Sequence, residues 1–378
     1  MATDGTGTAA VTTTDGSLRR RQVVVAGGVL ALAAAFGLDA SEVDARNKRR
    51  KRKKRRKHGK GGDNGRGGGR QVCSNGCTRS VCGQTPAGCP ILPINNIWNR
   101  RVDDQPVDAR SDAYVASIGV AAGLHPDFGS GLYEGKPFGI PLVRVSVGQP
   151  GVRVSFTGAA DESDPGPYPI PADAPVENGP CSTGDRHVIT VDASTCKLYE
   201  VFDAHRGATP TAPWSAGSGA VFDLRSNALR PETHTSADAA GLPMLPGLVR
   251  FDEVAAGHID HAIRFTANRT QKAYVWPARH YASDVTDPNV PPMGAWFRLR
   301  ADYPTDGLTQ QAKVIVEAMK VHGIILADNG SSWFMSGTPD ERWDNQALSQ
   351  VWNITGNDME AIDQSSLMVD PNSGQIRK

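Results

Sequence analysis

The chain is predicted to be all-β with a few helices, an antiparallel β-sandwich of jelly-roll or lectin-like type. Three observations favour this fold class. Glycine and proline are frequent, at 41 and 26 of 378 residues, apolar and polar residues alternate over short runs, and turn residues separate these runs at short intervals. Such short alternating runs are typical of sandwiches. Residues 91–378 approach the upper size of one hydrophobic core, so we expect a single domain there.

The expected strands follow from this alternation. They include a hairpin formed by residues 187–192 and 197–202, and a second hairpin formed by 323–327 and 332–336, which flank Asp328-Asn329-Gly330. Asn-Gly is the strongest short-range hairpin signal. The remaining strands are expected at residues 139–147, 152–156, 220–224, 259–265, 273–276 and 295–300.

Three helices are expected. Residues 309–322 place Val314, Ile315, Ala318 and Met319 on one face and end before Gly323, which predicts an amphipathic helix on a sheet. Asp344 is the expected N-cap of a short helix that runs to residue 352. A third helix is expected at residues 111–119.

Residues 1–45 have the pattern of an export signal. Arginines 19–21 precede a weakly apolar run of sixteen residues, 23–38, which is shorter than the roughly 20 residues of a membrane span. Consecutive arginines before such a run favour a twin-arginine signal that is cleaved on export. The alternatives are an ordinary secretory signal or an uncleaved anchor. We therefore expect a secreted or envelope-associated protein.

Residues 46–70 form a basic, glycine-rich segment. It carries fourteen Lys or Arg and one Asp, which is a net charge of +13. Residues 1–45 have a net charge of −2. Because the net charge of the whole chain is +1, residues 71–378 have a net charge of −10. A charge block of this kind stays extended and solvated. We expect a stalk that holds an acidic, monomeric domain away from a surface or binds an anionic lipid or wall polymer, and no specific nucleic-acid partner.

Six cysteines in an exported chain indicate disulfides. Four of them fall at 73, 77, 82 and 89, so that residues 71–90 form a Cys-rich segment, and their spacing lacks the paired C-x2-C of common zinc sites. Cys181 and Cys196 are expected to pair with each other across one predicted strand.

No motif specifies a reaction. The chain has no G-x-S-x-G elbow, H-E-x-x-H, phosphate loop or dinucleotide fingerprint, which makes serine hydrolases, common metalloproteases, kinases and dehydrogenases poor candidates. We expect neither a metal nor a cofactor. Three groups of residues remain as candidate sites.

The first group lies on the predicted strand 259–265. His258, Asp260 and Arg264 would share one face of that strand, where Asp260 could act as acid or base and Arg264 could hold a negative group. The alternative is a solvated outer face. His261, on the other face, is expected to be a buried structural histidine.

The second group combines aromatic and charged residues. Trp333, Asp340, Arg342 and Trp343 could bind a sugar, because rings stack on its C–H face and charged groups bind its hydroxyls. The structural alternative has both tryptophans in the core and Arg342 paired with Asp340.

The third group is a supply of carboxyls. Asp223 lies in an apolar strand, where half-burial would raise its pKa as a general acid requires, and Asp238 lies in a loop of small residues that a ligand could approach. Asp185, His187 and Glu200 belong to the same group of candidate residues.

Several segments resemble a group of exported bacterial proteins of unassigned activity. The resemblance is carried by residues 236–247 (SADAAGLPMLPG), 327–330 (ADNG) and 339–344 (PDERWD), together with 124–129 (LHPDFG) and 184–187 (GDRH), and covers about residues 89–365. It implies an exported soluble domain and brings no catalytic residues with it.

The function expected from location, architecture and these residues is a carbohydrate-active enzyme, a polysaccharide hydrolase or lyase with an open cleft. Asp223, Asp238, Asp260, His258 and Arg264 are its candidate catalytic residues, and a polysaccharide or cell-wall polymer is its expected partner. The alternatives are a non-catalytic glycan- or wall-binding module and a structural envelope protein.

Overall fold

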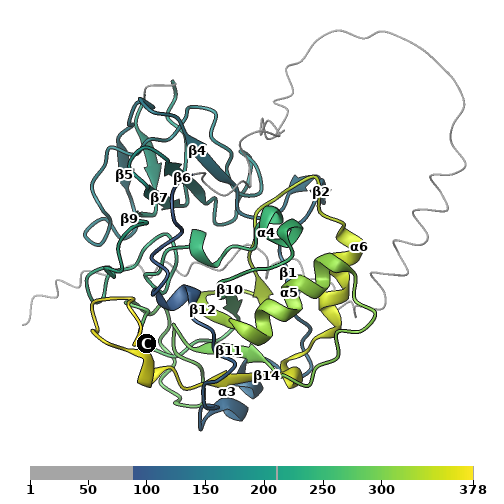
Figure 1. The fold of residues 1–378 in the computed structure, drawn as a ribbon. Helices are drawn as coiled ribbons and strands as arrows, with labels where there is room; N and C mark the ends of the chain where they lie inside the picture. Colours follow the sequence, from purple (N-terminus) through teal and green to yellow (C-terminus); the bar gives the residue numbers. More distant parts are fainter. Residues whose placement is uncertain (1–87, 210–211, 378) are drawn as a thin grey trace, which may run out of the picture.

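The computed structural model describes residues 88–209 and 212–377 (Figure 1). The predicted export signal, the basic stalk and residues 71–87 lie outside the described residues. The described chain is rich in strands and has few helices, as expected, and its strands form sheets of mixed direction.

The largest sheet has six strands in the order β1-β13-β10-β12-β11-β14. Strands β1 and β13 pair in parallel, as do β10 and β12, and the other pairings are antiparallel. The strands span His125–Pro126 (β1), Phe334–Met335 (β13), Ile263–Ala267 (β10), Ile324–Asn329 (β12), Trp296–Leu299 (β11) and Met359–Ile362 (β14).

A second sheet has four strands in the order β4-β6-β7-β9 (Figure 1). Its β4–β6 pair is parallel, and the β6–β7 hairpin and the β7–β9 pair are antiparallel. The strands are Leu142–Val145 (β4), Val188–Asp192 (β6), Lys197–Phe202 (β7) and Ser218–Asp223 (β9). Two further small sheets are formed by β2 (Leu132–Tyr133) with β3 (Lys136–Pro137) and by β5 (Val154–Phe156) with β8 (Trp214–Ala216).

The helices are short apart from one. Helix α5 (Gln310–Val321) buries Val314, Ile315 and Met319 and packs on β11, as its periodicity predicts. Within the described residues the other α-helices are α3 (Ser111–Ile118), α4 (Phe251–Ala256) and α6 (Asn345–Leu348), and the 3-10 helices are η1 (Ile97–Asn99), η2 (Leu245–Gly247), η3 (Ser349–Asn353), η4 (Gly356–Asp358) and η5 (Ser365–Leu367).

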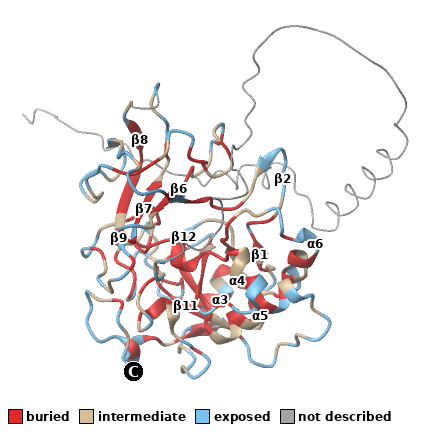
Figure 2. Cartoon of the chain, turned by 45° about the horizontal axis from the view of Figure 1, so that its top comes forward, coloured by how far each residue is buried: buried red, intermediate tan, exposed pale blue. Residues whose placement is uncertain are grey.

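Both sheets contribute to one large apolar cluster. Phe265 and Trp296 of the six-stranded sheet lie in the same buried cluster as Ile189 and Leu198 of the four-stranded sheet. The other face of the four-stranded sheet, with Val188, buries a smaller cluster under β5 and β8. Figure 2 shows the buried residues concentrated in the strands and the exposed ones on the peripheral loops and on β2.

Several predictions that rest on residues close together in the sequence are confirmed. The hairpin β6–β7, helix α5 and helix α3 are found where they were expected, and Asp344 caps α6 by accepting from the backbone N–H groups of Gln346 and Ala347. The sandwich of jelly-roll or lectin-like type is not confirmed, because four parallel strand pairs occur beside the expected antiparallel ones. Residues 273–276 form no strand, only an isolated bridge from Tyr274 to Met293.

The hairpin predicted at Asp328-Asn329-Gly330 is wrong. Strands β12 and β13 are not neighbours, because β10 lies between them and pairs with both. The Asn-Gly turn instead crosses the end of β10, where the Gly330 N–H donates to the Ala267 carbonyl at 3.0 Å. A Cβ at position 330 would lie 2.7 Å from the Thr266 hydroxyl, so the close crossing requires glycine.

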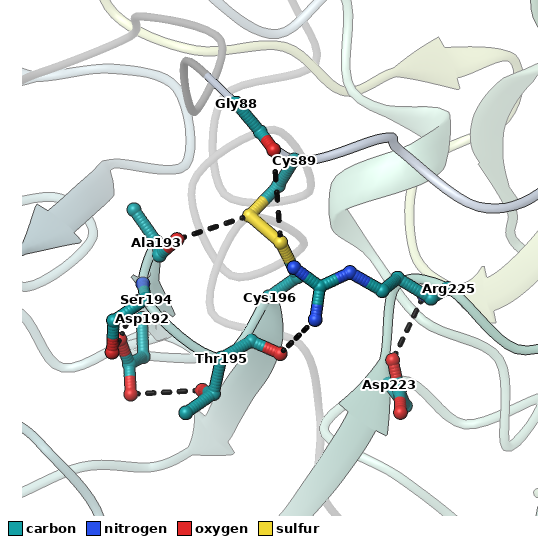
Figure 3. Close-up of a disulfide and its surroundings, with 9 residues drawn as sticks. All are labelled: Gly88, Cys89, Asp192, Ala193, Ser194, Thr195, Cys196, Asp223 and Arg225. Carbon is teal, nitrogen blue, oxygen red and sulfur yellow. Dashed lines mark hydrogen bonds between the residues drawn. A yellow bond between two sulfur atoms is a disulfide. The ribbon is translucent and has the colours of Figure 1, made fainter.

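The predicted bridge between Cys181 and Cys196 is also wrong. Cys196 is bonded to Cys89, with 5.5 Å between their Cα atoms (Figure 3). Strand β6 lies between the two positions and carries the chain away from the segment of Cys181 to the hairpin turn, where Cys196 meets Cys89. Cys181 is likewise disulfide-bonded rather than free. The observed bridge ties the start of the described chain to the turn of the β6–β7 hairpin.

Among the described helices, none has the length and apolar character needed to cross a membrane.

Candidate acid–base site

Ionisable side chains gather where the two sheets meet. We call this group the acid centre. Each of its members interacts electrostatically with at least one other member. It consists of Asp127, Glu177, Asp185, His187, Glu200, Asp238, Arg264 and Asp328.

The six-stranded sheet supplies one side of the acid centre. The register that pairs Thr266 of β10 with Phe334 of β13 places Arg264 opposite Ser336, and the Arg264 guanidinium donates to the Ser336 hydroxyl. Asp127, which continues β1, donates its backbone N–H to Met335 and therefore lies beside Ser336. Phe265 and Met335 alternate with these residues and point into the core on the opposite face.

Arg264 and Asp238 form the buried base of the acid centre. The guanidinium donates to both carboxylate oxygens, from Nη2 at 2.7 Å and from Nε at 3.0 Å, and both side chains are almost fully buried. Burial disfavours the charge of Arg264, but Asp238 outweighs burial and raises the pKa of Arg264. A buried two-bond pair of this kind is strong and directional.

The turn at residues 236–242 positions Asp238. The Ser236 hydroxyl donates to the Leu242 carbonyl at 2.7 Å and accepts from the Asp238 backbone N–H at 2.9 Å. Gly241 has a φ of 70°, and a Cβ there would lie 2.4 Å from the His234 carbonyl oxygen, so only glycine fits. The small residues noted in the sequence therefore serve a tight turn.

The segment before β6 supplies a second ion pair. His187 Nδ1 lies 2.7 Å from Glu177 Oε2, and His187 Nε2 lies 3.1 Å from the Ala237 carbonyl oxygen. Burial opposes charge on both side chains. The Glu177 charge nevertheless raises the pKa of His187 to about 9, and His187 holds the pKa of Glu177 below its ordinary value. At neutral pH the pair is an imidazolium and a carboxylate.

Arg186 fixes this segment. Its guanidinium donates to three backbone carbonyls, from Nε to Ala204 at 2.9 Å and from Nη1 to Ser182 at 2.6 Å and Pro180 at 3.1 Å. These bonds fix the backbone between Asp185 and His187, and both of these side chains interact with other members of the acid centre.

Asp127 is the most accessible carboxyl of the acid centre. It is exposed to solvent, yet the protein around it removes much of its hydration. This loss, followed by the charge of Glu177, raises the pKa of Asp127 to about 6, although Arg264 acts in the opposite direction. A group with this pKa can hold and release a proton near neutral pH.

Two half-buried carboxyls flank it. Burial raises the pKa of Asp185, with further contributions from Glu177 and Asp238, against His187 and Arg264. Burial and the neighbouring Asp238 charge raise the pKa of Asp328 well above its usual value, although Asp328 Oδ2 lies 3.8 Å from Arg264 Nη2.

Glu200 closes the acid centre from β7. Its carboxyl is fully buried and accepts from the backbone N–H groups of Met244 and Leu245 at 2.9 to 3.0 Å. Burial raises the pKa of Glu200 to about 7 against these hydrogen bonds. Glu200 thus connects the four-stranded sheet to the segment that carries Asp238. Six carboxyls in total surround one guanidinium and one imidazole.

The predicted catalytic residues are only partly brought together. Asp238 and Arg264 pair directly, although they were assigned to different groups. His258 and Asp260 do not share a strand face with Arg264, because β10 begins only at Ile263. They lie in the preceding turn, 65 and 75% exposed, with His258 Nδ1 2.9 Å from Asp260 Oδ2. Their solvated position matches the outer-face alternative.

Asp223 is not half-buried as expected. It is the exposed last residue of β9, and its carboxylate accepts from the Arg225 backbone N–H at 2.9 Å, closing a turn (Figure 3). The alternation of β9 sends Phe222 inward and Asp223 outward.

The predicted sugar-binding residues take their structural alternative. Trp333 is buried against Phe265, and Trp343 is buried beside Phe251, so neither ring offers a face to a ligand. The Arg342 guanidinium binds Asp340 through both Nε and Nη2, at 2.8 and 2.6 Å, and also contacts Asp252.

Asp127, Glu177 and Asp328 were not among the expected site residues. Asp127 and Asp328 occur in the segments that carry the resemblance, 124–129 and 327–330, as do Asp185 and His187 in 184–187. The presence of these ionisable residues in the segments that carry the resemblance was therefore the signal by which the sequence could have indicated the acid centre. Glu177 lies outside all of them, and no pattern marked it.

Within residues 88–209 and 212–377, no three His, Cys, Asp or Glu side chains are placed to hold a metal ion. Comparisons with protein-family models, curated proteins and solved structures yielded no match for the chain.

Proposed function

We propose that this protein is an exported carbohydrate-active enzyme, a polysaccharide hydrolase, whose acid–base chemistry takes place at the acid centre. The observation that carries the proposal is the opposite displacement of neighbouring carboxyl pKa values. Asp127 has a pKa of about 6, whereas that of Glu177 lies below its ordinary value. One protonated and one ionised carboxyl side by side are what glycosidic hydrolysis needs.

Each carboxyl has a role in this proposal. Asp127, accessible and protonated below about pH 6, donates a proton to the leaving oxygen. Glu177, held as a carboxylate by His187, acts as base or nucleophile on the opposite side. Asp185 and Asp328, whose own pKa values are raised, can take up or release a proton beside this pair.

Hydrolysis is favoured over elimination by the state of Arg264. A lyase that cleaves a uronate must neutralise the substrate carboxylate with a cation. The Arg264 guanidinium is already occupied by Asp238 and Ser336, and His187 is paired with Glu177. Because both cations of the acid centre are already paired, we propose a neutral polysaccharide rather than a uronate as the substrate.

We also propose that the chain reaches the cell exterior by the twin-arginine route and that residues 46–70 keep it near an anionic envelope surface. The charge pattern of residues 1–70 supports both statements. Replacing Arg20 and Arg21 by Lys should retain the precursor in the cytoplasm, as measured by fractionation. Undiminished export would contradict the twin-arginine route.

The test of function is a screen of the purified protein against neutral and acidic polysaccharides, reading reducing ends and unsaturated products together. We expect new reducing ends without unsaturation on a neutral polymer, abolished in Asp127→Asn and retained in Asp260→Asn. Asp260 is a matched control because it is an exposed aspartate outside the acid centre. Unsaturated ends would contradict hydrolysis, and retention of a polymer without cleavage would favour a glycan-binding module.

A further inference from the structure

A row of aromatic rings stands beside the carboxyls on the same face of the six-stranded sheet. The register pairs His125 of β1 with Phe334 of β13, and Phe334 with Thr266 of β10. Thr266 in turn pairs with Asp328 of β12. Trp352, in η3, stacks on His125 from outside the sheet edge. We call Trp352, His125 and Phe334 the aromatic row; it leads across the sheet to Asp328.

The rings of the aromatic row are parallel and closely spaced. His125 and Phe334 have centroids 4.2 Å apart and planes 12° apart, and His125 and Trp352 have centroids 5.4 Å apart and planes 13° apart. Burial lowers the pKa of His125 to about 4, so its imidazole is uncharged at neutral pH. The three rings therefore form a rigid, uncharged stack.

Trp352 differs from the other tryptophans of the six-stranded sheet region. Trp296, Trp333 and Trp343 are buried, and each indole N–H donates to a backbone carbonyl. The Trp352 side chain is held on one side by His125 and is nevertheless 54% exposed. A large ring that is ordered and half-exposed loses little conformational entropy when it binds a ligand.

The aromatic row is continuous with the acid centre. His125 and Asp127 are two residues apart on an extended segment, so they lie on the same side, roughly 7 Å apart along the strand. Asp328, a member of the acid centre, ends the row on the other side. A polymer that contacts Trp352 with one unit and extends along the aromatic row thus brings its following units to the carboxyls of the acid centre.

We propose that the aromatic row is a sugar-binding subsite, in which a neutral pyranose ring of the polysaccharide stacks its C–H face on Trp352 while adjoining residues of the glycan reach Asp127. This inference rests on the proposed function and adds the residue that binds the substrate chain. An uncharged ring platform beside surplus carboxyls suits a neutral sugar and disfavours an anionic one.

The test compares Trp352→Leu, which keeps an apolar side chain without a ring, with Trp352→Phe, which keeps a flat ring. Both changes are at a half-exposed position, and a thermal unfolding curve for each verifies the fold. The probes are the hexasaccharides and disaccharides of cellulose, xylan, laminarin and chitin, measured for binding by calorimetry and for cleavage by chromatography. Tyr303→Leu, after β11 toward the opposite edge of the sheet, removes a partly buried ring far from the aromatic row and is the control for loss of an aromatic side chain elsewhere.

We expect Trp352→Leu to weaken hexasaccharide binding, or raise KM, about tenfold with kcat unchanged, and Trp352→Phe to stay within about threefold. Disaccharides should respond less, because they cannot occupy both the row and the acid centre. Equal binding and cleavage by wild type and Trp352→Leu would overturn the subsite and leave the hydrolase proposal standing. If the wild type neither binds nor cleaves any of the eight probes, the subsite and the proposed function both fail.

Discussion

Two buried ionic clusters in this protein differ in their charge balance. In the Arg250 cluster, which consists of Arg250, Glu253 and His261, the guanidinium binds the Glu253 carboxylate and donates to the Leu245 and Leu248 carbonyls at 2.9 and 3.0 Å. His261 Nε2 lies 3.2 Å from the same carboxylate. One carboxylate thus faces one guanidinium and one imidazole, whereas the acid centre sets six carboxyls against one guanidinium and one imidazole.

The pKa values express this difference. Burial alone would raise the pKa of Glu253, but Arg250 and His261 outweigh burial and lower it to about 2. In the acid centre burial prevails, and the pKa values of Asp127, Asp185 and Asp328 rise. The balanced cluster stabilises the fold. The unbalanced one costs stability, and a site retained at such a cost is a candidate for function.

The largest expected effect is on catalysis. Asp127→Asn removes the proposed proton donor and should lower kcat by about 10²- to 10⁴-fold, the usual contribution of a general acid. Initial rates on the polysaccharide that the wild type cleaves measure it. An Asp127→Asn enzyme with wild-type kcat would remove the acid centre from the mechanism.

The next largest effect is on stability. Arg250→Met leaves Glu253 without its guanidinium partner and should reduce the free energy of unfolding by about 3–5 kcal/mol, as when one member of a buried pair is removed. Denaturant unfolding measures the loss. Arg342→Met is the control, because Arg342 is half-exposed and such pairs contribute about 0–1 kcal/mol. Equal losses in the two variants would show that burial does not distinguish them.

The Arg250 cluster also predicts an acid limit of stability. The pKa of Glu253 is lowered on folding, so its contribution is present above its unfolded value of 4.5 and is lost as the pH falls toward about 2. The contribution is on the order of 3 kcal/mol. Unfolding measured against pH should therefore show wild type and Glu253→Gln converging between pH 4.5 and 2. If the unfolding free energies of the two proteins stay equally far apart between pH 4.5 and 2, the lowered pKa of Glu253 is refuted.

A further prediction concerns the pH profile of activity. Because the proton donor must be protonated, kcat/KM should fall about tenfold per pH unit above the Asp127 pKa of about 6. A profile of initial rates from pH 4 to 9 gives this limb. Activity that rises through pH 6 and stays constant to pH 9 would assign Asp127 to a different role.

The sequence predicted what depends on neighbouring residues. The periodicity of α5, the cap at Asp344 and the hairpin β6–β7 are local, and all three were found. The Asn-Gly signal failed because a strand distant in sequence, β10, pairs between its two flanking strands. This long-range pairing cannot be predicted from a local turn preference.

The candidate site shows the same difference between what is local in the sequence and what depends on long-range pairing. Asp238 and Arg264 were chosen for their residue type and surroundings, and the fold joins them. Glu177 and Asp328 become part of the site only through long-range pairing, by which β12 and the segment before β6 approach Arg264. Both the sugar-binding and the core interpretation of Trp333 and Trp343 stayed open, because sequence does not distinguish a ring in the core from a ring on the surface such as Trp352.

The most direct test of the charge-balance account is the free energy of unfolding at pH 7 for Asp127→Asn and Asp328→Asn beside Glu253→Gln. Raised folded-state pKa values mean that ionisation of Asp127 and Asp328 destabilises the fold at this pH, so the first two variants should equal or exceed the wild type, by up to about 1 kcal/mol after solvent screening of the exposed Asp127. Glu253→Gln should be less stable. Destabilisation of all three by similar amounts would contradict the account, because the acid centre would then be a structural cluster like the other.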